Sequence, residues 1–177
     1  MDKGVVIQKA REFLSIYNPN RLVPFPFEET VKKIGSIEIK SYPTDNEVNG
    51  AIYLSDRVYS IIINSDKPAK RQYFTLAHEM GHYWLHREDL VDEPGSGFVD
   101  LKDAESMSVF LRPDRTPGIS KLARQEREAN TFAAEILMPE EEVREFFKIS
   151  GDIEDTAAAF NVSTVAMAIR LEKLGLA

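Results

Sequence analysis

The segment His78-Glu79-Met80-Gly81-His82 constrains this chain more than any other feature of its sequence. Residues four apart on an α-helix lie one turn above each other, so two imidazoles with this spacing can reach one metal ion. The glutamate between them projects about 100° around the helix from the first histidine, where it can contact a metal-bound water without becoming a ligand. Zinc peptidases use this H-E-x-x-H order, in which the metal acidifies the water and the glutamate accepts its proton.

The residues around this segment favour a metal site over a chance occurrence of five letters. The flanking runs Tyr73–Ala77 and Tyr83–Leu85 are strongly apolar. The helical period places both histidines on the same face as Phe74, so we expect them to point toward the core. Unpaired imidazoles are costly to bury there, and a bound metal removes that cost. We therefore predict that His78 and His82 are metal ligands.

The histidine and cysteine content limits which other ligands a metal could have. The 177 residues contain three histidines, His78, His82 and His86, and no cysteine. A zinc site without thiolates must combine imidazoles with carboxylates, and catalytic sites usually have three protein ligands. His86 lies one more turn along the helix, about 6 Å farther, which is too far for bonds of about 2 Å. We expect His86 to support a ligand or line the cleft, and a carboxylate to be the third ligand.

Net charge and targeting signals limit the partners and the location. The formal net charge is −7, whereas direct binding to DNA or RNA normally needs a basic surface, so we expect no nucleic-acid binding. The N-terminus lacks the apolar stretch of a secretory signal, and no segment approaches the roughly 20 apolar residues of a membrane span. We therefore expect a cytoplasmic protein that does not bind membranes.

Hydrophobic periodicity and turn residues predict an α+β protein. Ser65 or Asp66 is expected to cap the helix that carries the histidines. The acidic stretch 88–119 is broken by glycine and proline, so we predict a mobile loop beside the cleft. The expected elements are a helix near 3–17, a short helix that ends at Gly35, a strand at 37–42, a hairpin of 51–54 and 58–64, the histidine helix to about 87, and helices at 120–137, 153–159 and 163–174.

The helix at 120–137 offers three glutamates as the third ligand. Glu126 lies roughly 50° from the centre of the apolar stripe, so it should point inward. Glu128 lies roughly 110° away, where ligand and solvated charge are both open, and we expect Glu135 in solvent. Asn130 follows Glu126 by one turn and could hydrogen-bond that ligand or brace a histidine.

The C-terminal tail has the spacing of a helix-turn-helix, and we interpret residues 151–177 as a helical subdomain after a main domain of residues 1–150. Its last helix offers only Arg170 and Lys173 as cations. Base readout needs polar and basic side chains, so we favour a packing or partner-docking element over a DNA reader.

Two blocks of the sequence resemble the ImmA/IrrE-type metallopeptidases of bacteria and their mobile elements. The first is Phe74–His82 with Leu85 and His86, and the second is Glu126–Pro139. The tail from Phe160 onward is also similar, so that the resemblance covers roughly residues 24–176. This chain departs from the family in the long acidic insert between the two blocks.

This resemblance implies a thermolysin-like zincin fold with a small β-sheet packed on the H-E-x-x-H helix and a gluzincin-like zinc site. It makes His78 and His82 ligands, Glu79 the base, and Glu126, from the E-x-x-A-N block, the third ligand. Zinc is the expected cofactor, with manganese or iron as alternatives where oxygen ligands participate. Family members typically cleave a helix-turn-helix repressor and so relieve repression of transcription, after DNA damage or during mobile-element transfer. Some resemble toxin-antitoxin components.

Three hypotheses follow for the function. The first is a zinc endopeptidase that acts on a helix-turn-helix repressor, in a stress response, a mobile element or a toxin-antitoxin pair. Tyr73, Tyr83 and His86 are its candidate oxyanion donors, and an edge of the 51–64 hairpin could hold the substrate as an added strand. The second is a metal-containing binding protein that sequesters a regulator without cleaving it. The third is a DNA-binding regulator that uses the tail.

Overall fold

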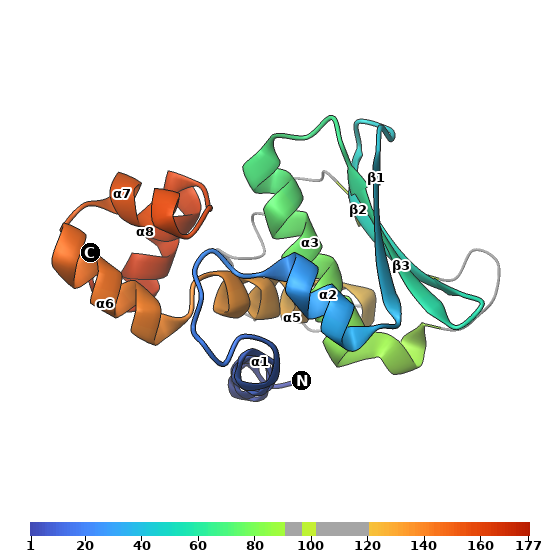
Figure 1. Ribbon diagram of the computed structural model, residues 1–177, viewed down its shortest axis with the longest axis horizontal. Helices are drawn as coiled ribbons and strands as arrows, with labels where there is room; N and C mark the ends of the chain where they lie inside the picture. Colours follow the sequence, from blue (N-terminus) through green and yellow to red (C-terminus); the bar gives the residue numbers. More distant parts are fainter. Residues whose placement is uncertain (91–96, 102–120) are drawn as a thin grey trace.

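The fold is an α+β arrangement in which one long helix, α3, lies between a small sheet and a group of other helices (Figure 1). The computed structural model describes residues 1–90, 97–101 and 121–177. The expected α+β class is confirmed. The elements are α1 Lys3–Tyr17, α2 Phe27–Ile34, β1 Ile37–Tyr42, β2 Val48–Ser55, β3 Val58–Asn64, α3 Ala69–His86, the 3-10 turn η1 Arg87–Asp89, β4 Phe98–Leu101, α5 Lys121–Leu137, α6 Glu140–Ser150, α7 Ile153–Ala159 and α8 Thr164–Lys173.

The sheet is mixed and has the strand order β1-β3-β2-β4. β1 runs parallel to β3, whereas β2 is antiparallel to both β3 and β4. The predicted hairpin is therefore confirmed, although β2 begins at Val48, three residues earlier than expected. Both hairpin strands are interior, because β1 covers one of them and β4 the other. The expectation that a hairpin edge receives the substrate is wrong, and within the described residues β4 forms the sheet edge on that side.

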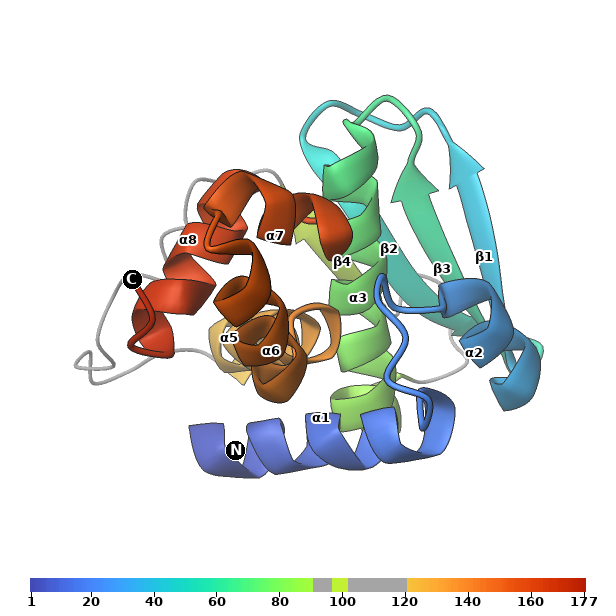
Figure 2. The same ribbon diagram turned by 60° about the vertical axis from the view of Figure 1, so that its left-hand side comes forward.

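α3 packs on one face of the sheet and on α5, so it lies at the centre of the core (Figure 2). Gly81 allows α3 and α5 to approach closely, since a Cβ there would lie 3.0 Å from Cα of Ala129. The predicted cap of α3 is wrong: its N-cap is Pro68, which has no side-chain acceptor, and the helix begins at the next residue. A proline with φ near −54° already fits the start of a helix, so no polar side chain is required there.

The segment predicted as an acidic loop contains a short strand. β4 occupies Phe98–Leu101, and Asp100 within it is buried. A four-residue strand with an inward carboxylate shows little of the apolar alternation that identifies strands. Residues 91–96 and 102–120, on which the rest of the loop prediction falls, lie outside the described residues.

The tail forms α7 and α8 as predicted, with Ser163 capping α8, and the helix α6 before them was missed. Glu135 was expected in solvent, but it is buried and forms a two-bond ion pair with Arg170 of α8, at 2.6 and 2.9 Å. This pair ties the tail to α5, while the domain division after residue 150 stays a prediction. Among the described residues, no helix is both long enough and apolar enough to cross a bilayer.

Candidate metal centre

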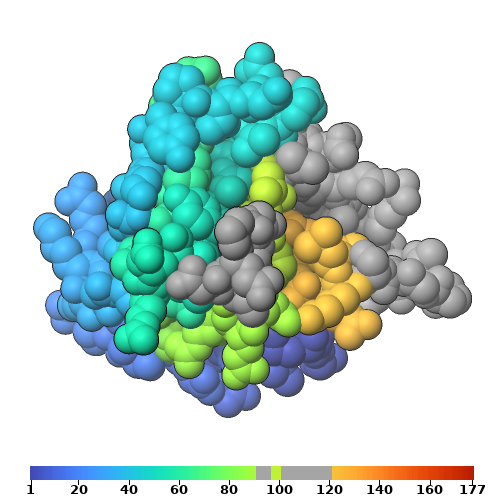
Figure 3. Space-filling model, turned by 90° about the vertical axis from the view of Figure 1, so that its right-hand side faces the viewer, coloured from blue at the N-terminus to red at the C-terminus, as the bar shows by residue number. Residues whose placement is uncertain are grey.

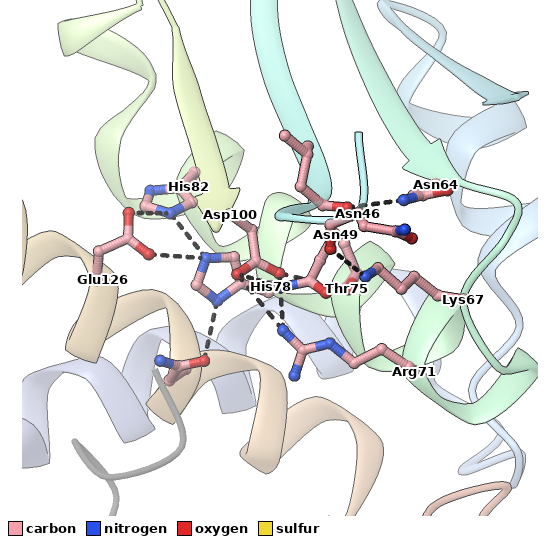
Figure 4. Close-up of polar contacts among 12 residues, drawn as sticks. Asn46, Asn49, Asn64, Lys67, Arg71, Thr75, His78, His82, Asp100 and Glu126 are labelled. Atoms are coloured by element: carbon pink, nitrogen blue, oxygen red, sulfur yellow. Dashed lines mark hydrogen bonds and ion pairs between the residues drawn. The ribbon is translucent and has the colours of Figure 1, made fainter. Parts of the chain in front are cut away.

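Three side chains from α3 and α5 converge to form what we call the metal cluster: His78, His82 and Glu126 (Figure 4). The two carboxylate oxygens of Glu126 lie 3.2 Å from Nε2 of His78 and 3.3 Å from Nε2 of His82. The two Nε2 atoms are 3.1 Å apart. Both histidines are buried and Glu126 is 25% exposed, so the cluster opens toward the surface on the α5 side.

The spacing and chemistry of these donors fit a metal ion. Ligands at about 2.0 Å from zinc in a tetrahedral arrangement are about 3.3 Å from one another, close to the distances in the cluster. Both Nε2 atoms and the carboxylate of Glu126 point at the same small volume, where a cation could contact all three. The Nδ1 atom of His82 also has no hydrogen-bond partner within the described part of the chain. The cluster can therefore hold a divalent cation.

The pKa values of the three side chains in the metal cluster place one proton on His78 and leave His82 neutral and Glu126 ionised. Burial alone would lower the pKa of His78, but the hydrogen bond to Glu126 and the nearby negative charges raise it to about 9. Burial lowers the pKa of His82 to about 4, because the same carboxylate compensates only in part. Burial acts to raise the pKa of Glu126, yet its hydrogen bonds to both histidines lower it to about 2. An ionised carboxylate beside one neutral imidazole suits a cation, and the remaining proton must leave when a metal binds.

Glu79 lies beside the metal cluster without joining it. Its side chain is fully buried, and neither carboxylate oxygen has a hydrogen-bond partner among the described residues. Burial raises the pKa of Glu79 well above its usual value; His78 opposes this shift, and Asp100 and Glu126 add to it. A buried, unpaired carboxylate is costly. A buried carboxylate with a raised pKa and no competing partner is the kind of group that general acid–base catalysis uses.

Two neighbours hold the histidines in place. Nδ1 of His78 donates to Oδ1 of Asn130 at 3.0 Å, which leaves Nε2 directed at the cluster and confirms the expectation that Asn130 braces a histidine. The ring of Phe98 on β4 stacks on His82 with centroids 4.1 Å apart and planes 14° apart. Sequence reasoning missed Phe98 because it falls in the predicted loop; the adjacent pair of strand-favouring residues, Phe98 and Val99, was the available signal.

His86 and Glu128 lie close to each other outside the metal cluster. His86 is buried, and its Nε2 lies 3.4 Å from Glu128, as expected for a residue that does not bind the metal. Glu128 is also buried and forms an ion pair with the amino group of Met1. It is therefore neither a solvated charge nor a member of the metal cluster.

The tyrosines proposed as oxyanion donors are occupied elsewhere. The hydroxyl of Tyr73 donates to the carbonyl of Phe25 at 3.0 Å. The hydroxyl of Tyr83 lies 3.5 Å from Oγ of Ser36. Both hydroxyls therefore contact elements away from the metal cluster, and the expectation that either one stabilises an oxyanion is wrong.

Comparisons with known proteins connect this geometry to a family. The profile of the Peptidase_M78 family, described as the IrrE N-terminal-like domain, matches residues 33–172. Among solved structures, a Mycobacterium tuberculosis transcriptional regulator is similar, with a TM-score of 0.47 and 17% sequence identity. That alignment covers 94% of this chain and 51% of the regulator, so the chain spans about half the regulator's length. No curated protein matches this chain.

Proposed function

This chain belongs to the Peptidase_M78 family of IrrE N-terminal-like domains, a metallopeptidase-type family, and from that premise we propose that it is a zinc-dependent endopeptidase. The observation that carries the proposal is the convergence of His78, His82 and Glu126 beside a buried, unpaired Glu79. A purely structural zinc site needs no such carboxylate, because its ligands fill the coordination sphere. Glu79 therefore favours hydrolysis over the sequestering alternative.

Each side chain has a distinct part in the proposed reaction. Zinc, when bound, would polarise the scissile carbonyl and bring the pKa of a bound water toward about 7. Glu79 accepts the proton of the attacking water and returns it to the leaving amine, as general base and then general acid. Asn130 fixes the ring of His78, and Phe98 fixes that of His82 and excludes water beside it.

The substrate would bind as an extended strand along β4. Within the described residues β4 pairs only with β2, so its outer edge offers backbone donors and acceptors to a peptide. Figure 3 looks onto this side, where the lime segment that contains β4 reaches the surface between the teal strands and the orange α5. Since α5 carries Glu126, a peptide on this edge would pass close to the metal cluster.

We propose that the substrate is a helix-turn-helix repressor whose cleavage relieves repression, in a stress response, a mobile element or a toxin-antitoxin pair. The net charge of −7 supports this partner class, because a basic DNA-binding protein is complementary to it. Direct DNA binding by the tail is disfavoured, since Arg170, one of two cations expected to serve it, is buried against Glu135.

The test is a cleavage assay with the zinc-loaded protein and such a repressor, read by mass spectrometry. We expect one dominant cut, absent with a chelator and absent for Glu79→Gln that retains its zinc. A repressor that forms a complex but stays intact under zinc, manganese and iron would contradict the peptidase and support the sequestering protein.

A further inference from the structure

The edge strand β4 is held to α3 by two inward side chains at alternate positions. Phe98 stacks on His82, and Asp100, two residues later, points at the first turns of the same helix. Val99 between them is 51% exposed. A four-residue strand at a sheet edge has few backbone hydrogen bonds to hold it, so these two side-chain contacts set its position over the helix.

Asp100 collects three donors from two other elements, and we call these four residues the Asp100 cluster (Figure 4). Its carboxylate is 3% exposed and lies 3.1 Å from Nη2 of Arg71 on α3. Thr75, one turn later on α3, donates to the same oxygen at 3.4 Å, and Asn49 on β2 donates to the other at 3.3 Å. One buried carboxylate thus joins β4, β2 and α3, and removing its charge would leave Arg71 without its partner.

The Asp100 cluster lies one helical turn before the proposed base. Thr75 and Glu79 are four residues apart on α3, and Gly50, next to Asn49, fits directly over both. A Cβ on Gly50 would lie 2.4 Å from Cγ2 of Thr75 and 3.5 Å from Oε1 of Glu79. At the Asp100 cluster, β2 therefore packs so closely on α3 that no side chain larger than a hydrogen fits at Gly50. This close contact fixes the distance of β2, and of β4 beside it, from Glu79.

We infer that Asp100 and Arg71 are positioning residues, which hold β4 at the height where a substrate strand on its edge meets the metal cluster and Glu79. This inference rests on the proposed peptidase function, because it assigns the strand that aligns the substrate. Neither residue is hydrogen-bonded to a member of the metal cluster, although the negative charge of Asp100 raises the pKa values of His78 and Glu79. Their loss should therefore misplace a bound peptide without removing a metal ligand.

The inference has two parts, that the Asp100 cluster holds β4 and that β4 aligns the substrate. Hydrogen–deuterium exchange tests the first, structural part without an activity assay. In Asp100→Asn, we expect the peptide that spans residues 97–101 to exchange about tenfold faster, the effect of losing roughly one good hydrogen bond. Arg71→Lys keeps the charge but changes the position of the donor, which is Nη2 alone in the wild type, and should give a smaller increase. The matched control is Glu135→Gln, which also replaces a buried carboxylate facing an arginine by its amide, and should leave exchange at 97–101 unchanged.

A pair of hydroxamate ligands, measured on the zinc-loaded protein, tests the second part, that β4 aligns a bound peptide. Acetohydroxamate can bind only the metal, whereas a tripeptidyl hydroxamate also needs the strand edge. We expect Asp100→Asn to weaken the tripeptidyl compound about tenfold, the loss of roughly one backbone hydrogen bond. Because the charge of Asp100 acts on both His78 and Glu79, any change it causes at the metal is shared by the two compounds, and the readout is the ratio of their affinities. That ratio should fall about tenfold in Asp100→Asn at full zinc content and stay unchanged in Glu135→Gln.

Each part has a result that overturns it. Unchanged exchange at 97–101 in both Asp100→Asn and Arg71→Lys would show that the cluster does not hold β4. Faster exchange with an unchanged ratio of the two hydroxamate affinities would show that β4 does not align the ligand. If neither hydroxamate binds the wild-type protein, the proposed zinc chemistry fails, and exchange still decides whether the cluster holds the strand.

Discussion

Replacing Arg170 by methionine should destabilise the protein strongly, because it breaks a buried ion pair that joins the tail to α5. The two side chains are each 8% exposed and share two hydrogen bonds, and Nε of Arg170 also donates to the carbonyl of Met138 at 2.9 Å. Removing one partner of such a pair leaves an uncompensated buried charge, which costs about 3–5 kcal/mol. We expect a loss in the free energy of unfolding toward the lower end, about 3 kcal/mol, because both side chains keep some contact with solvent.

The matched double variant separates the missing partner from the missing contact. Arg170→Met combined with Glu135→Met removes both charges and keeps the volume apolar, so it should recover most of the lost free energy. Urea denaturation followed by circular dichroism measures both values. A single variant that loses less than about 1 kcal/mol, or a double variant no more stable than the single, would refute the reasoning that this pair is desolvated and holds the tail.

Three further predictions concern the metal centre. Glu79→Gln should retain one zinc per chain by elemental analysis yet lose activity by about a hundredfold or more, because only the proton acceptor is removed; wild-type turnover would exclude this role. Glu126→Ala should weaken zinc affinity, measured by competition with a chromogenic chelator, by more than the roughly 10–100-fold typical of residues that only support a ligand. Glu128→Ala should weaken it only mildly. The reverse order would assign the third ligand to Glu128. Zinc affinity should rise about tenfold per pH unit from 7 to about 9 and then level off. The reason is that His78, whose pKa is raised to about 9, must lose its proton when zinc binds, whereas His82, whose pKa is lowered to about 4, is already neutral. Calorimetry that shows no proton release at pH 7 would contradict this.

Local periodicity predicted the side chains that form the metal cluster, although by itself it left Glu128 open as an alternative to Glu126. The spacing of His78 and His82 is a property of one helix, and the inward direction of Glu126 follows from the apolar stripe of α5. Asn130 could be placed one turn from Glu126 for the same reason. These inferences need no knowledge of which elements pack together, beyond the assumption that the two apolar faces meet.

The predictions that failed depend on contacts between distant parts of the chain. Glu135 appeared solvated because its partner, Arg170, lies 35 residues later, and no helical period shows that pairing. β4 was missed because one of its two inward residues, Asp100, is a carboxylate, which is buried only because Arg71, Thr75 and Asn49 surround it. The helix α6 is a different case: Val143, Phe146 and Phe147 recur at helical spacing and pack on the core, so its signal was present in the sequence and was overlooked.

The central claim is that His78, His82 and Glu126 together bind a catalytic metal ion. The most direct test is a crystal structure of the zinc-loaded protein, with anomalous differences collected on both sides of the zinc absorption edge. We predict one strong zinc peak about 2.0–2.2 Å from Nε2 of His78, Nε2 of His82 and a carboxylate oxygen of Glu126. A zinc peak between His86 and Glu128, or no peak at the metal cluster in fully loaded protein, would contradict the account.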